Sequence, residues 1–299
     1  MSLLARFTRL LKDPPPVCAF ELSEAGIAVA QMDGDPQMSF AALEAGVISV
    51  SPLKDNVLRP EALLHQVRAV PAPGNGGRKR RPAALILPDY AVRVTVLDFD
   101  TFPSDSKEQE SLVRFRMKRT VPFDVDSAAL SFQAQPKRSG GKQIDVAVAI
   151  APLEVVARYE TPFRLAGYQT GLVTTSLLAA LTLAPAAGLK VLVKRTGRIL
   201  SIAVLDHGSL KLVRSIELAD YSAEEIANHL FPTFAYVEDQ LSAGPDAVLV
   251  CGFGAATDGA RTWLETELKV PVQPLTSRFG SPGEYDAGLL GCVETIRES

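Results

Sequence analysis

The sequence predicts an α/β protein built from two related lobes. Each half of the chain begins with a β-hairpin and later places an apolar strand directly before a helix, which indicates a weak internal duplication. The first half also contains a strand–helix–strand–strand segment at 92–151. With 299 residues, the chain is long enough to bury a large core in such a bilobed arrangement.

Apolar runs separated by turn residues predict the elements of the first half. Its opening hairpin, 17–30, is broken by the turn Ser23–Gly26. The expected elements that follow are a strand at 45–50, a helix at 60–70, strands at 83–88 and 92–99, a helix at 105–120, strands at 129–135 and 144–151, and a helix at 152–167.

The second half repeats the alternation. A meander of three strands is followed by a long helix, which begins with Ser222 and, three residues later, Glu225, the pattern of a capping box. The expected elements are strands at 191–193, 199–205 and 210–216, a helix at 222–241, a strand at 247–251, a helix at 257–268 and a strand at 270–273.

Composition excludes several classes of function. The net charge of −3 gives no basic surface for nucleic acid, so we expect no nucleic-acid partner. Three cysteines without a CxxC pair indicate a reducing compartment, and three widely spaced histidines offer no metal-ligand spacing. We therefore expect no metal site and no catalytic residues of those kinds.

The first twelve residues form a short amphipathic segment. Leucines and a phenylalanine recur at helical spacing, with Arg6, Arg9 and Lys12 between them. Such a segment can rest on an anionic membrane surface, which would make the protein peripheral to a membrane. A helix packed on its own domain or on a partner fits the same pattern.

Several segments in a fixed order resemble the PilM-like family of type IV pilus assembly proteins, which belongs to the actin-like ATPase superfamily and is related to FtsA. They include a strand running into an LP turn, a helix ending in a basic residue before VPF, and a helix closing on AG. These segments are 87–103, 110–133, 145–169, 248–275 and 285–293. The resemblance spans nearly the whole chain, and 110–133 is its most distinctive part.

The resemblance implies an actin-like, ribonuclease H-like fold with a strand–helix–strand–strand insert in the first lobe. The first lobe would comprise 1–91, 169–189 and the C-terminal 286–299. The insert would be 92–168, and the second lobe 190–285.

In this superfamily the first phosphate-binding hairpin carries an acid, a glycine turn and a polar or basic residue. Glu21 keeps the acidic position here. Ser23 stands at the glycine position, Glu24 adds a negative charge where a phosphate should sit, and Ala28 stands where PilM-like chains usually have lysine. The first hairpin therefore departs from the nucleotide-binding pattern.

The second hairpin departs further. Its Asp-x-Gly triplet is replaced by Lys194, Arg195 and Thr196, which reverses the charge facing a magnesium ion. Gly252 and Gly254 keep the adenosine-side turn, although fold packing alone would also favour glycine there. We expect no cofactor and no ATPase activity, while the cations at 194–198 leave anion or ATP binding open.

The resemblance implies a non-catalytic cytoplasmic adaptor beneath the inner membrane. It would bind the cytoplasmic N-terminal tail of a PilN-like single-span protein and connect it to the pilus motor ATPases. The expected docking residues lie on the first insert strand and the insert helix: Val92, Val94, Val96, Leu112, Phe115 and Arg116. An actin-like ATPase or sugar kinase, or the cytoplasmic domain of a GspL-like type II secretion protein, is the alternative.

Overall fold

The computed structural model describes residues 15–71, 80–136 and 143–298. The amphipathic segment at 1–12 lies outside them, so its expected role is a prediction only. None of the helices in the described part of the chain combines the length and the apolarity of a membrane span.

The first lobe is built on a five-stranded sheet of order β3-β2-β1-β4-β8. Its hairpin pairs β1 with β2, and β1, β4 and β8 run parallel. The strands are β1 (Cys18–Leu22), β2 (Gly26–Gln31), β3 (Gln37–Ala42), β4 (Arg81–Leu87) and β8 (Tyr168–Thr175). Helices α2 (Pro60–Ala69) and α4 (Leu153–Leu165) supply the core on one face, and α8 (Ala287–Glu298) packs on the other.

The insert is a three-stranded antiparallel sheet of order β5-β7-β6 with one helix. The short helix η1 (Asp89–Ala91) leads into it. Its elements are β5 (Arg93–Phe99), α3 (Ser106–Met117), β6 (Ala128–Ala134) and β7 (Ile144–Pro152). The side chain of Asp105 caps α3 by accepting hydrogen bonds from the backbone amides of Lys107 and Glu108, so the helix begins where the sequence predicts.

The second lobe is a five-stranded sheet of order β11-β10-β9-β12-β13. Its strands are β9 (Leu189–Thr196), β10 (Ile199–Asp206), β11 (Ser209–Glu217), β12 (Ala247–Cys251) and β13 (Val272–Pro274). Helices α6 (Ala223–Leu241) and α7 (Thr257–Leu268), the latter preceded by η3 (Gly254–Ala256), pack on one face.

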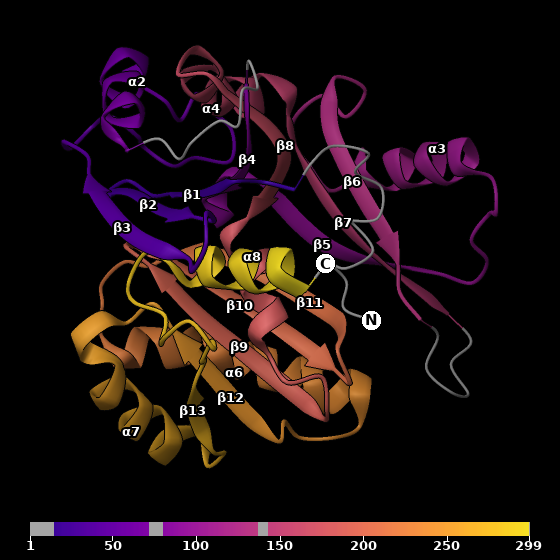
Figure 1. Ribbon diagram of the computed structural model, residues 1–299. Helices are drawn as coiled ribbons and strands as arrows, with labels where there is room; N and C mark the ends of the chain where they lie inside the picture. Colours follow the sequence, from indigo (N-terminus) through magenta and orange to yellow (C-terminus); the bar gives the residue numbers. More distant parts are fainter. Residues whose placement is uncertain (1–14, 72–79, 137–142, 299) are drawn as a thin grey trace.

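Helices α5 (Ser176–Ala180) and α8 lie between the two large sheets (Figure 1). The short helix η2 (Leu181–Leu183) directly follows α5. Leu177 and Ala180 of α5 pack with residues of the second sheet, whereas Ala179 and α8 pack with the first. The two helices approach closely because Gly291 has no side chain: a Cβ there would lie 2.0 Å from the carbonyl oxygen of Ala179.

Most predicted elements are present, and the strand–helix–strand–strand order of the insert is confirmed. The strand expected at 45–50 is wrong. That stretch is a loop, and the third strand is β3, whose residues are mostly exposed. The prediction missed two further elements. The apolar residues of β8 alternate only weakly, and those of α8 directly follow a stretch of turn residues.

One boundary changes. The predicted insert, 92–168, includes the helix α4, but Tyr159 and Phe163 of α4 are buried in the first-lobe core, where the ring of Phe163 contacts that of Phe20. The helix that returns from the insert therefore belongs to the first lobe in its packing.

Candidate functional site

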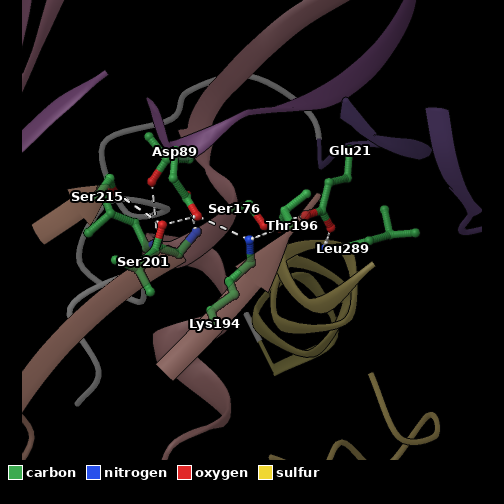
Figure 2. Close-up of polar contacts among 11 residues, drawn as sticks. Glu21, Asp89, Ser176, Lys194, Thr196, Ser201, Ser215 and Leu289 are labelled. Atoms are coloured by element: carbon green, nitrogen blue, oxygen red, sulfur yellow. Dashed lines mark hydrogen bonds and ion pairs between the residues drawn. The ribbon is translucent and has the colours of Figure 1, made fainter. Parts of the chain in front are cut away.

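Three charged residues from separate segments meet where the two lobes face each other (Figure 2). Glu21 comes from β1, Asp89 from η1 and Lys194 from β9. All three are buried: Glu21 is 2% exposed and Asp89 6% exposed, and Lys194 is 2% exposed. Because a buried charge is costly unless it is paired, their partners decide what this site can do.

Lys194 is the only one of the three that carries a positive charge. Its ammonium donates hydrogen bonds to Asp89 Oδ2 at 3.0 Å and to Thr196 Oγ1 at 2.6 Å. Burial opposes its charge, but Asp89 and Glu21 outweigh burial and raise the pKa of Lys194. The ammonium is therefore held charged between two carboxylates of the opposite lobe.

Glu21 is bound by donors at the starts of both central helices. It accepts a hydrogen bond from Ser176 Oγ at α5 and another from the backbone amide of Leu289 on α8, at 2.6 Å. Burial raises the pKa of Glu21 to about 7, although Lys194 and these donors act in the opposite direction. The backbone amide of Leu289, near the start of α8, could otherwise bind an anion, but it is already occupied by the side chain of Glu21.

Asp89 is the site residue that sequence reasoning missed. It accepts from the backbone amide of Leu177 at 2.5 Å and from Ser201 Oγ at 2.9 Å, and Ser201 lies 3.2 Å from Ser215 Oγ. In the sequence, Asp89 is a single acid directly after the apolar strand at 83–88. Its pairing with Lys194 is evident only in the folded structure.

The first hairpin turn is closed on itself. Ser23 Oγ accepts from the amide of Gly26 and donates to its carbonyl, both at 3.1 Å, so that amide is engaged within the turn. Glu24 lies apart from the network around Glu21, since its carboxylate accepts a hydrogen bond from the amide of Val50 on a neighbouring loop, at 2.6 Å.

Ala28 lies beside Glu21. The two residues are register partners in the β1–β2 hairpin, so their side chains share one face of the sheet. A lysine at position 28, as in PilM-like chains, would place a cation near Glu21 from within the first lobe. In this chain the cation near Glu21 comes from Lys194 in the second lobe.

The adenosine-side turn keeps its glycines for a structural reason. Gly252 has φ +82°, and a Cβ there would lie 1.8 Å from the carbonyl oxygen of Arg195. Gly254 has φ +56°, in the region that favours glycine. Arg195 lies 5.3 Å from the ring centroid of Phe253 and 5.5 Å from that of Tyr221, so its guanidinium is engaged by aromatic rings.

The charged network does not fit a magnesium–nucleotide complex. Magnesium takes oxygen ligands, and an ammonium cannot serve as one. The second hairpin presents Lys194 at the position that the superfamily gives to an acid, and Asp89 already pairs with that lysine. Among the described residues, no group of three or more His, Cys, Asp or Glu side chains is arranged to hold a metal ion.

A second feature is an apolar groove of about 700 Å³ between the insert, the first lobe and the second lobe. One wall is the face of the insert sheet that α3 does not cover, and most of its residues are small: Val92, Val94, Ala129, Ser131, Ala147, Ala149 and Ala151, together with Gln133 and Gln135. The other walls come from β8, the α5–η2 segment and the β10–β11 hairpin: Leu172, Val173, Leu178, Leu181, Leu205 and Leu210.

The structure separates the predicted docking residues. Val92 and Val94 line the groove, and Val96 packs with the same cluster. The insert helix lies on the opposite face of the sheet, so Leu112, Phe115 and Arg116 do not line this groove. Leu112 packs into the insert core, Phe115 is 64% exposed, and Arg116 stacks on Phe99.

Comparison with known proteins agrees with this architecture. No protein-family model matches the chain, and no match was found among curated proteins. A chain of a PilM–PilN type IV pilus biogenesis complex superposes with a TM-score of 0.75 at 16% identity, over 95% of this chain and 99% of that one.

Two further solved structures share the fold. The cytoplasmic domain of EpsL, an inner-membrane component of the type II secretion system of Vibrio cholerae, gives a TM-score of 0.53 at 12% identity, over 94% of both chains. An actin-like ATPase-fold protein of Bacteroides thetaiotaomicron gives 0.52 at 12% identity, over 86% of this chain and 89% of that one. The chain therefore has the bilobed actin-like ATPase fold, in a PilM-like form.

Proposed function

We propose that this protein is a non-catalytic adaptor of a type IV pilus or related assembly machine. In this proposal it works at the cytoplasmic face of the inner membrane and binds the N-terminal tail of a PilN-like membrane protein. The observation that carries the proposal is the apolar groove between insert and lobes, in a chain whose fold resembles that of a PilM–PilN complex.

The groove suits an extended peptide. β8 ends the first sheet and β6 ends the insert sheet, so among the described strands each pairs on one side only. A peptide strand can add to such an edge through main-chain hydrogen bonds, with alternate side chains entering pockets. The row Val94, Ala149 and Ser131 runs across the insert sheet in register and leaves room for large apolar side chains of a ligand.

The proposal that the protein has no catalytic activity rests on the charged network of Glu21, Asp89 and Lys194. An ATPase needs oxygen groups that hold or orient a magnesium ion, and this chain places Lys194 in that position and pairs it with Asp89. An adaptor needs no such chemistry, whereas an ATPase or a sugar kinase does.

A binding measurement on the full chain tests the adaptor role. A labelled peptide with the sequence of the cytoplasmic tail of a PilN-like protein from the same genome should bind with a Kd that fluorescence anisotropy can measure. Ala149→Phe, which fills the groove, should weaken binding at least tenfold. The matched control is Phe115→Asp on the opposite side of the insert, which should leave the Kd within twofold.

Two outcomes would count against the proposal. If Ala149→Phe binds the peptide as well as the wild type at an unchanged melting temperature, the groove is not the docking site. If only the tail of a secretion-system partner binds, the GspL-like alternative is favoured.

A further inference from the structure

The buried ion pair connects the two lobes. Lys194 and its neighbours Thr196 and Ser201 belong to the second sheet, whereas Glu21 and Asp89 belong to the first lobe (Figure 2). The pairing distance between Lys194 Nζ and Asp89 Oδ2 is 3.0 Å, and these side chains are 2% and 4% exposed.

The arrangement is asymmetric in charge. The first lobe contributes two buried carboxylates and the second lobe contributes one cation. Amide and hydroxyl donors satisfy the carboxylates in part: Leu289 and Ser176 serve Glu21, and Leu177 and Ser201 serve Asp89. Removing the ammonium would leave two acids without a counter-ion in a buried site, a change that is strongly destabilising when only one partner of a buried pair is lost.

We propose that Lys194 is a built-in cation that locks the two lobes in one closed arrangement without a metal ion or a nucleotide. The ammonium is tethered to β9, so its effective concentration between the carboxylates does not depend on any ligand. The two lobes are then closed whether or not a ligand is bound. The groove, whose walls come from both lobes and the insert, is therefore formed before any ligand binds.

Distances between spin labels test the lock. Glu61 on α2 and Glu265 on α7 are exposed residues of opposite lobes, and the three native cysteines are buried, so Glu61→Cys with Glu265→Cys gives two selective labelling sites. The labelled protein should give one narrow distance distribution, and the distribution should be the same in EDTA and in Mg-ATP.

Lys194→Met removes the charge at nearly constant volume and should broaden or lengthen that distribution. The matched control is Lys190→Met on the same strand, because Lys190 pairs with Asp246 inside the second lobe and should leave the distance unchanged. Lys194→Ala should behave like Lys194→Met until propylammonium is added, and propylammonium should restore the narrow distribution. Propanol, which has a similar shape and no charge, should not.

An unchanged narrow distribution in Lys194→Met would overturn the proposal, and so would equal rescue by propanol. A distance that shortens in Mg-ATP would also overturn it, because closure would then depend on a ligand. If the variants fold poorly, refolding that requires propylammonium supports the lock, and refolding that is indifferent to it counts against the lock. None of these readouts uses the tail peptide, so the lock and the adaptor role can fail separately.

Discussion

Gln135, directly after β6, exchanges two hydrogen bonds with the backbone of Leu210 on β11. Its side-chain amide donates to the carbonyl of Leu210 and its carbonyl accepts from the amide of Leu210, both at 2.6 Å. The ion pair between Lys211 and Asp145, at 2.6 Å, lies beside it. The insert is therefore fixed to the second lobe as well as to the first, and the groove between them has defined walls.

Gln135→Ala should destabilise the protein by about 3 kcal/mol, because one buried amide and one buried carbonyl of Leu210 lose their partners. Urea unfolding measures the change. Gln133→Ala is the matched control two residues earlier on the same face of β6. The side-chain carbonyl of Gln133 has no partner, so we expect a change within about 0.5 kcal/mol. Equal effects of both variants would contradict the prediction that the hydrogen bonds of Gln135 to Leu210 stabilise the protein.

Stability should fall with rising pH because of Glu21. Burial raises its pKa from 4.5 to about 7 in the folded protein, so between these values the folded state binds more protons than the unfolded state. The contribution is fully present below the unfolded pKa and is lost as the pH rises through 7. Relative to Glu21→Gln, the wild type should lose up to about 3 kcal/mol between pH 4.5 and 8.

Denaturant unfolding of both proteins across that pH range provides the measurement. A difference between wild type and Glu21→Gln that does not change with pH would mean that Glu21 stays ionised in the folded protein.

Gly252→Ala should destabilise by at least about 3 kcal/mol, since the added Cβ would meet the backbone of Arg195 and the left-handed φ disfavours alanine. Gly259→Ala in α7 is the matched control. A Cβ there meets nothing within 4 Å, so alanine should stabilise the helix by up to about 1 kcal/mol. Thermal unfolding of the two variants separates a packing glycine from a nucleotide-binding one, and a mild effect at Gly252 would reopen a ligand role for this turn.

Mg-ATP should bind with a Kd in the millimolar range or weaker, because Lys194 occupies the cation position and the Gly26 amide is engaged by Ser23. Isothermal titration calorimetry on the full chain is the measurement, with phosphate release as a second readout. A micromolar Kd would contradict the proposed loss of nucleotide function.

Local pattern was enough to predict the insert. The helix at 105–120 has a capping aspartate, acids early and bases late, and the strands around it are short apolar runs, so each element is specified by its own residues. The strand β3 and the true place of α4 could not be predicted in this way. β3 is an exposed edge strand, and α4 is assigned to a lobe only by the packing of Tyr159 and Phe163 in the first-lobe core.

The departure of the hairpin positions from a nucleotide-binding pattern could be predicted from residue type alone, because the sequence has a lysine at 194 and a serine at 23. The interactions that these residues make instead are visible only in the folded protein. The partner of Lys194 is Asp89, 105 residues away in the chain, and the groove is made by strands from three parts of the fold. Charge pairing and groove shape depend on distances between segments, and those distances are fixed only when both lobes pack around α5 and α8.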